Sequence, residues 1–355
     1  MTDHINKMNR RKFIGGSVAA TLAAAAGTPA VSLASDQQSK KKTVKDLPYN
    51  PRTHKAMPTR NLGKTGFQVG IFSLGGQATL EVKGKEKESV EIINRAIDLG
   101  VNYIDTAAGY GNGVSEINIG QVLKERRNEV FQTSKTADRT YDGSMQLLEK
   151  TLKQLQTDHL DLWQLHNVRT QDELDKIFSK DGALKALLRA REDGMVRFLG
   201  VTGHFEPLVL KQALERFDFD TILMAINAAD PHYLSFKRYL LPIAQKKGIG
   251  IIGMKLATRG RMLSTWTPPP IEQQPERLRT SKPGTITMKE SLHYNCTLGV
   301  STNIVGVDNV AQLEEDVKWA SEFSPLSPEQ MEEIEFKTLP IVRQGLYFRR
   351  WDMGA

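Results

Sequence analysis

From about residue 60 onward, short apolar runs alternate with longer segments in which apolar residues recur at helical spacing. Most of the short runs are bounded by Gly, Asp or Asn, and they are largely apolar, as parallel strands buried on both faces are. The pattern predicts eight strands, over Val69–Leu74, Val101–Ile104, Val130–Thr133, Leu160–Leu165, Val196–Val201, Thr221–Ala225, Ile249–Met254 and Thr302–Val305.

A helix is predicted after each strand, and eight strand–helix pairs in succession indicate an α/β fold, a closed (β/α)8 TIM barrel. An open doubly wound sheet has the same rhythm, but it normally carries a Gly-x-Gly-x-x-Gly turn that Gly75-Gly76-Gln77 does not match. Ser115 is the predicted N-cap of the second helix, and Glu116 lies in its first turn. The predicted helices span Glu88–Leu99, Ser115–Arg126, Gly143–Leu155, Asp172–Glu192, Glu206–Arg216, Phe236–Lys247, Thr287–Thr297 and Val310–Phe323.

Two segments interrupt this rhythm. Asn61–Gly66 contains glycines that suit a tight turn, so it predicts a hairpin before the barrel. Thr265–Pro283, after the seventh strand, carries five prolines, which exclude regular helix or strand through most of it. We interpret it as an active-site loop; a surface insertion is the alternative.

The N-terminus is typical of an export signal. Asn9-Arg10-Arg11-Lys12-Phe13-Ile14 precedes an Ala- and Gly-rich stretch that ends near Ala34, and it resembles a twin-arginine signal. The alternative, a membrane helix, is weakened by four Gly and Pro residues in the stretch, and no second apolar span suggests a permanent membrane anchor. We therefore expect a signal peptide over residues 1–34, recognised by the twin-arginine export machinery, and a periplasmic or otherwise exported protein. Residues 35–57 form a polar linker, a tether or a segment draped on the surface, and residues 58–355 form the barrel with a C-terminal extension.

Composition narrows the class of function. The net charge is +7, of which the first 34 residues contribute +3, and the remaining +4 is too mild to indicate a nucleic-acid partner. The single cysteine, Cys296, excludes an intramolecular disulfide, and we expect it to be buried on a helix. The seven histidines show no His-x-x-x-His spacing, and no His-x-His follows the first strand, so no metal site is predicted.

Four polar residues stand at the ends of three successive predicted strands. Asp105 follows the second strand, Tyr110 lies five residues later, Lys135 ends the third strand, and His166 ends the fourth. Each alone has an ordinary structural explanation, but the carboxyl ends of barrel strands meet at one mouth. The set suits carbonyl reduction: we expect Lys135 to lower the pKa of Tyr110, Asp105 to hold the lysine, and His166 to orient the carbonyl oxygen.

The segment Ile104-Asp105-Thr106-Ala107-Ala108-Gly109-Tyr110-Gly111, followed by Ser115-Glu116 and Gly120, resembles the aldo-keto reductase signature. The resemblance extends from about Pro58 to Phe323. It implies a TIM barrel, NAD or NADP as cofactor, a small carbonyl or alcohol substrate, and a catalytic tetrad of Asp105, Tyr110, Lys135 and His166.

The cofactor positions implied by this resemblance follow the later strands. Thr202 and Asn227 are expected at the nicotinamide amide, although Gly203 replaces an asparagine of the family. Met254, followed by Lys255, stands where an aromatic residue is common. Asp308 stands where a basic residue is frequent, so we expect NAD to bind at least as well as NADP. The implied adenosine-phosphate segment contributes Gly306, Asp308, Gln312 and Glu315.

The sequence therefore predicts an NAD(P)-dependent oxidoreductase, possibly acting on a sugar, with Tyr110 as proton donor and acceptor. Free cofactor is scarce outside the cytoplasm, which leaves an epimerase with a tightly held cofactor as one alternative. The other alternative is a regulatory or binding barrel like the potassium-channel β subunits, although an intact tetrad argues against pure binding.

Overall fold

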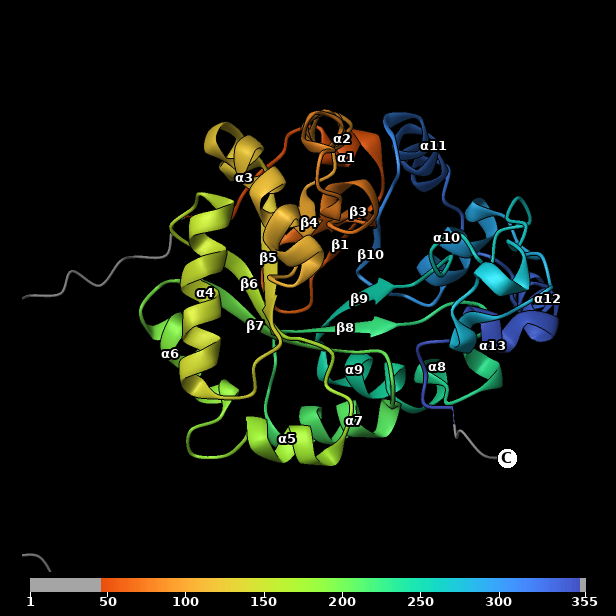
Figure 1. Cartoon of the computed structure of the whole chain (residues 1–355). Coiled ribbons are helices and arrows are strands. Elements are labelled where there is room, and N and C mark those ends of the chain that lie inside the picture. Colours follow the sequence, from red (N-terminus) through yellow and green to blue (C-terminus); the bar gives the residue numbers. More distant parts are fainter. Residues whose placement is uncertain (1–45, 352–355) are drawn as a thin grey trace, which may run out of the picture. The chain divides into compact units, whose positions relative to one another are not determined.

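The computed structural model describes residues 46–351, which form a closed barrel of eight parallel strands surrounded by helices (Figure 1). Each strand pairs with its neighbours in chain order, and β10 closes the barrel against β3. The predicted TIM barrel is thus confirmed. Its strands are β3 (Phe72–Gly75), β4 (Tyr103–Asp105), β5 (Phe131–Thr136), β6 (Leu160–Leu165), β7 (Val196–Gly203), β8 (Thr221–Ala225), β9 (Gly250–Met254) and β10 (Thr302–Val305).

The first predicted strand, Val69–Leu74, is in fact parts of two strands. β2 (Gln68–Gly70) pairs antiparallel with β1 (Thr59–Asn61) in the predicted hairpin, and β3 begins two residues later. Periodicity did not reveal the break because the apolar run continues through Ile71. The hairpin residues Leu62 and Phe67 are buried, and they pack with Phe131 and other barrel residues to fill the interior.

The helices follow the predictions, except where local chemistry breaks two of them. The predicted Asp172–Glu192 is two helices, because the backbone closes tightly at Gly182, where a Cβ atom would lie 2.2 Å from the Ile177 carbonyl oxygen. The predicted Phe236–Lys247 breaks before Pro242, which lacks the N–H that a helix interior needs. The observed helices are α2 (Glu86–Asp98), α3 (Val114–Arg126), α4 (Tyr141–Leu155), α5 (Gln171–Ile177), α6 (Ala183–Glu192), α7 (Pro207–Arg216), α8 (Phe236–Tyr239), α9 (Leu241–Lys247), α10 (Met288–Thr297) and α11 (Val310–Ser321).

The predicted start of α3 was wrong. Gly113, in the left-handed region, is the N-cap, and Ser115 lies inside the helix with its hydroxyl 2.8 Å from that of Thr106. Glu116 lies in the first turn, as predicted, but it is fully buried and accepts hydrogen bonds from Ser134 and Thr151. Both side chains tie α3 to neighbouring elements, and the helix pattern alone does not contain those contacts.

Residues 46–57 lie against the barrel. Of the two forms predicted for the linker, this part of it fits a segment on the protein surface and not a free tether. These residues include α1 (Thr53–Ala56), and the buried Asn50 donates a hydrogen bond to the carbonyl of Ile97 at 2.8 Å. The predicted signal peptide lies outside the described residues. None of the helices between residues 46 and 351 has the length and apolar character needed to cross a bilayer.

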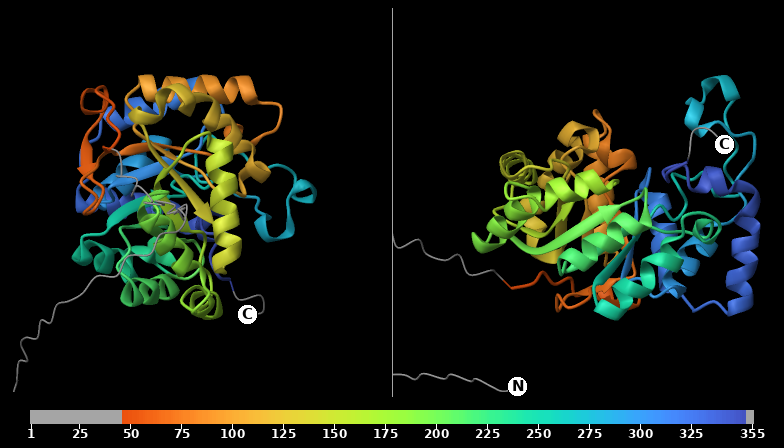
Figure 2. Two further views of the ribbon diagram at one scale, coloured as in Figure 1. Left: turned by 90° about the vertical axis from the view of Figure 1, so that its left-hand side faces the viewer. Right: turned by 90° about the horizontal axis from the view of Figure 1, so that it is seen from below.

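A C-terminal extension and the long loop after β9 lie at the barrel end toward which the arrows of β8 and β9 point (Figure 1; Figure 2, right). The extension comprises α12 (Pro328–Thr338), η7 (Leu339–Ile341) and α13 (Val342–Gly345). Leu346 of the extension and Met262 of the loop share an apolar cluster with Tyr294 of α10. Cys296 is buried on α10, as predicted. Short 3-10 turns occur at η1 (Ala78–Glu81), η2 (Tyr110–Gly113), η3 (Arg127–Glu129), η4 (Asp230–His232), η5 (Ile271–Gln273) and η6 (Glu276–Leu278).

Candidate active site

Strand alternation and register bring polar side chains together at the mouth of the barrel. Tyr103 packs in the barrel interior and Ile104 packs among the residues outside the strands, so Asp105 points inward again. Asp105 is level with Thr133 on β5, and Lys135 is level with Gln164 on β6. Inward positions on three neighbouring strands therefore lie side by side.

Asp105 and Lys135 form a buried ion pair at this level. Lys135 Nζ lies 2.5 Å from Asp105 Oδ2 and also donates to the Thr106 carbonyl at 2.7 Å. Asp105 Oδ1 accepts from Thr133 Oγ1 at 3.0 Å and from Gln164 Nε2 at 3.4 Å. The sequence analysis missed Thr133 and Gln164, although each stands two residues before a predicted site residue and so shares its face of the strand.

Tyr110 and His166 complete the group. Lys135 Nζ lies 5.0 Å from the centre of the Tyr110 ring, and that ring meets the His166 ring edge-on with 5.9 Å between centres. The backbone holds Tyr110 at the start of η2, where Gly111 has φ +56° and a Cβ atom would lie 2.1 Å from the Glu81 carbonyl oxygen. Only glycine fits there. The structure thus brings all four members of the predicted tetrad together.

The pKa of Tyr110 differs from our expectation. Burial raises the pKa of the phenol above its ordinary value, and the nearby Lys135 ammonium opposes this rise without reversing it. Lys135 thus lowers the pKa of the phenol as predicted, but burial outweighs it, and the sequence does not reveal how deeply the mouth buries the phenol. Tyr110 keeps its proton at neutral pH and is suited to donate it.

The imidazole of His166 is neutral over the same range. Burial, together with the positive charges of Lys135, Arg139 and Lys255, lowers its pKa to about 3. A neutral imidazole carries one N–H donor, which can hydrogen-bond a carbonyl oxygen without supplying a charge.

The predicted cofactor residues lie at the ends of strands five to eight, on the other half of the same rim. Thr202, on β7, is buried, and its hydroxyl accepts from the backbone N–H of Asn167 at 2.7 Å. Asn227 follows β8, and its side-chain amide donates to the carbonyls of Lys255 and Gly345 at 3.0 and 3.2 Å. Its oxygen accepts from the Ala229 N–H, so the side chain of Asn227 is occupied by the fold and does not fit the predicted contact with nicotinamide. We correct that prediction here.

Lys255 directly follows β9 and reaches across the mouth toward the first strand. Its Nζ donates to Gln77 Oε1 at 3.1 Å, and no ion pair to it occurs within residues 46–351. Burial and the positive charges of Arg259 and Lys135 lower its pKa to about 8. A partly buried cation without a carboxylate partner is the kind of group that holds a phosphate or another anion.

The segment after β10 is open to solvent. Gly306, Asp308, Gln312 and Glu315 are all exposed, and the side chain of Asn309 caps α11. Gln312 Oε1 accepts from the Asp308 N–H at 2.8 Å, and the Gln312 amide lies 3.4 Å from Asp308 Oδ2. Gly306 and Asp308 lie in the loop before α11, and Gln312 and Glu315 lie in its first turns. No cluster of His, Cys, Asp or Glu suited to a metal ion occurs in the described part of the chain.

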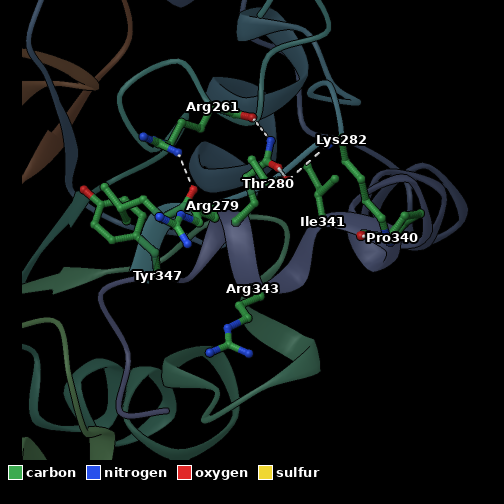
Figure 3. Close-up of a pocket in the computed structure, with 10 residues that line it drawn as sticks. Arg261, Arg279, Thr280, Lys282, Pro340, Ile341, Arg343 and Tyr347 are labelled. Atoms are coloured by element: carbon green, nitrogen blue, oxygen red, sulfur yellow. Dashed lines mark hydrogen bonds between the residues drawn. The ribbon is translucent and has the colours of Figure 1, made fainter. Parts of the chain in front are cut away.

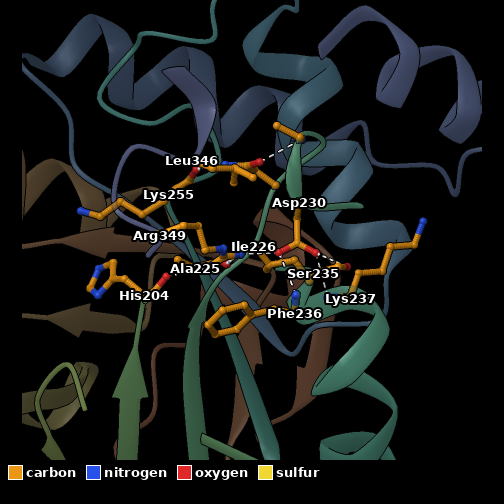
Figure 4. A network of polar contacts seen from close by, with 12 residues as sticks. His204, Ala225, Ile226, Asp230, Ser235, Phe236, Lys237, Lys255, Leu346 and Arg349 are labelled. Carbon is orange, nitrogen blue, oxygen red and sulfur yellow. Dashed lines mark hydrogen bonds and ion pairs between the residues drawn. The ribbon is translucent and has the colours of Figure 1, made fainter. Parts of the chain in front are cut away.

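The sequence analysis also missed a buried network beside the mouth (Figure 4). Arg349, from the extension, pairs with Asp230 and donates to the carbonyls of Ala225 and His204. The His204 ring lies 2.8 Å from Asn167 Oδ1 through Nδ1, and burial holds its pKa well below the ordinary value. No local signal links Asp230 to Arg349, which lie 119 residues apart.

Comparison with known proteins gives one consistent family. A sequence model of the Aldo/keto reductase family matches residues 68–338. L-galactose dehydrogenase of Arabidopsis thaliana is 27% identical over 308 residues, which cover 79% of this chain and 94% of that protein. An uncharacterized oxidoreductase of Bacillus subtilis, YqkF, is 22% identical over 82% of this chain and 98% of its own.

The solved structures agree in fold. The holo form of an aldo-keto reductase from Bacillus halodurans has a TM-score of 0.64 and 24% identity, covering 79% of this chain and 96% of that one. A thermostable aldo-keto reductase, Tm1743, solved in complex with the inhibitor epalrestat, has a TM-score of 0.59 and 25% identity.

Proposed function

This chain belongs to the aldo/keto reductase family and is an oxidoreductase of carbonyl and alcohol groups; from that premise we propose that Tyr110 is its proton donor and acceptor. The observation that carries the proposal is the buried Asp105–Lys135 pair, which places an ammonium 5.0 Å from the centre of the Tyr110 ring. The relative named L-galactose dehydrogenase supports a sugar or another polyhydroxylated compound as substrate.

The residues divide the work as follows. The phenol of Tyr110 gives its proton to the carbonyl oxygen, and the Lys135 ammonium stabilises the phenolate that remains. Asp105 holds the ammonium in place, and the neutral His166 donates a hydrogen bond to the same oxygen. A bound nicotinamide supplies the hydride at the carbonyl carbon, or accepts it in the reverse direction.

The donor set at the mouth fits such a cofactor. Lys255 is a partly buried cation that pairs with no described carboxylate, and this suits a phosphate-bearing ligand. The other groups that we propose hold it are Thr202, the exposed Gly306 and Asp308 before α11, and Gln312 and Glu315 in its first turns. Helix N-termini favour negative charge, which agrees with a phosphate there.

Replacing the proposed proton donor tests the function. Tyr110→Phe should lower turnover by roughly 10²- to 10⁴-fold and leave cofactor affinity nearly unchanged, because only the acid–base group is removed. Sugars and sugar alcohols are the first compounds to screen as assay substrates. Tyr103→Phe is the matched control, since it removes a buried phenol hydroxyl deeper in the same barrel. Equal turnover of Tyr110→Phe and the parent would make Tyr110 a structural residue.

We propose that NAD binds at least as tightly as NADP. The acid at Asp308 repels the extra phosphate of NADP, and this phosphate normally needs a cation, preferably a guanidinium. Fluorescence titration of the apo protein with both cofactors measures the preference, and Asp308→Arg should shift it toward NADP. Asp172→Arg, an equal charge change at an exposed position on α5, is the control. Clearly tighter NADP binding by the parent would reject this role of Asp308.

We also propose that the protein is exported by the twin-arginine route, on the support of the Arg10-Arg11 pair and the Ala-rich stretch behind it. Replacing both arginines with lysine keeps the charge but loses the guanidinium geometry, so the precursor should accumulate in the cytoplasm. Cell fractionation with an antibody to the barrel measures this. Normal export of the double variant would contradict the proposal.

A further inference from the structure

A cavity of about 150 Å³ lies between the long loop after β9 and the C-terminal extension, and no residue of the tetrad lines it. One wall comes from the loop, with Arg261, Arg279 and Lys282, and the other comes from the extension, with Arg343 and Tyr347 (Figure 3). Each wall comes from a different part of the chain, so the cavity exists only in the folded protein.

The cavity is positively charged. Four cationic side chains line it, those of Arg261, Arg279, Lys282 and Arg343, and no Asp or Glu does. Within residues 46–351, none of the four forms an ion pair. Two of them, Arg261 and Arg279, stand on the same wall without a carboxylate partner, and an anion between these two would offset their mutual repulsion.

Contacts within the cavity hold its parts in place. The Arg261 guanidinium lies 5.3 Å from the Trp266 ring centre and 5.9 Å from that of Tyr347, and it donates to the Leu278 carbonyl at 3.2 Å. Gln344 bridges the two walls, because it accepts from the Thr280 hydroxyl at 2.8 Å and donates to the Arg261 carbonyl.

Arg261 and Arg279 are the two arginines on the loop wall of the cavity. The Arg261 guanidinium lies 5.9 Å from the centre of the Tyr347 ring, whereas Lys282 Nζ donates to the Pro340 carbonyl at 2.7 Å and Arg343 points away from both arginines in Figure 3. Arg261 is fixed by its contacts, but the Arg279 side chain is exposed and makes no interaction with another described residue. One anchored and one free guanidinium on the same wall suit a ligand that enters the cavity and contacts both.

We propose that this cavity binds a small polyanion, with phosphate or carboxylate groups held by Arg261 and Arg279. Guanidinium groups offer paired N–H donors that match the oxygens of both groups. A ligand that touches both walls would stabilise the folded state by linkage, and it would tie the loop to the extension. The anion has two possible sources, the phosphates of a nucleotide cofactor or a separate small molecule.

Inorganic pyrophosphate is the probe, and the full-length protein is titrated with it by calorimetry at low salt. We expect saturable binding, weakened about tenfold by Arg279→Ala and further by Arg261→Gln/Arg279→Ala, because each charge-assisted pair contributes on this scale. Raising the ionic strength should weaken it as well. Arg238→Ala is the control, since it removes an exposed arginine of α8 that does not line the cavity.

Arg279 is exposed, so its substitution should leave the fold intact, and circular dichroism checks this. Competition then separates the two sources. If pyrophosphate displaces NADP and Arg279→Ala weakens NADP binding, the cavity holds cofactor phosphates; if neither occurs, it is a separate anion site. The proposal is overturned if wild-type protein shows no saturable binding, or if Arg279→Ala and Arg238→Ala bind pyrophosphate equally. These measurements need no enzymatic turnover, so they succeed or fail independently of the proposed function.

Discussion

Two buried ion pairs lie at the mouth of this barrel, and they differ in what surrounds the cation. Lys135 donates to Asp105 and to the Thr106 carbonyl, and it also faces the Tyr110 ring, which belongs to the proposed chemistry. Arg349 donates to Asp230 and two backbone carbonyls, and its guanidinium stacks on Phe236 at 3.9 Å. The cation of the first pair therefore faces a proposed catalytic residue, whereas the cation of the second contacts only structural groups.

The two carboxylates differ in the same way. Asp230 accepts from the Ser235 hydroxyl and from the N–H groups of Phe236 and Lys237, so it organises the start of α8. Besides its bond from Lys135, Asp105 accepts from the side chains of Thr133 on β5 and Gln164 on β6. We infer that the Asp230–Arg349 pair stabilises the fold and the position of His204, and that the Asp105–Lys135 pair positions a reacting group.

The largest effect on stability is expected from Asp230→Asn. It leaves the buried Arg349 without a counter-charge, and an arginine cannot give up its proton in a protein, so the free energy of unfolding should fall by about 3–5 kcal/mol. Chemical denaturation measures the loss. Asp218→Asn, which removes an exposed carboxylate paired with Lys247, should change stability little. A loss no greater than that of the control would mean that the pair does not hold the extension.

Asp105→Asn should have its main effect on turnover. Without the carboxylate, the Lys135 ammonium is no longer held near the Tyr110 ring. We expect turnover to fall by about 10²-fold, which is the lower end for loss of an acid–base group, because Tyr110 itself remains. The loss of stability should be smaller than for Asp230→Asn, because a buried lysine can give up its proton and an arginine cannot. Steady-state kinetics and denaturation on the same preparation measure both. If Asp105→Asn and Asp230→Asn lowered the free energy of unfolding equally, the two ion pairs would not differ in their structural role.

The site could be predicted where it depends on the order of strands. Asp105, Lys135 and His166 end successive strands, and parallel strands in a barrel must end at one mouth, so their meeting follows from position alone. The pKa of Tyr110 could not be predicted, because it depends on the net burial of the phenol against one ammonium. The role of Asn227 was misjudged for a related reason: its partners, Lys255 and Gly345, come from distant parts of the chain.

By itself, the sequence determined the alternation of elements, the closed barrel and the four residues at its mouth, because these depend on spacing within each strand–helix unit and on the order of the units. Only the tertiary structure decided which buried polar groups pair with one another through hydrogen bonds and ion pairs. The Asp230–Arg349 pair, the buried Glu116 and the cationic cavity all join segments that meet when the chain returns on itself. Hydrophobic periodicity reports which face of a segment is buried, but it contains no information about the partner that a buried polar group finds.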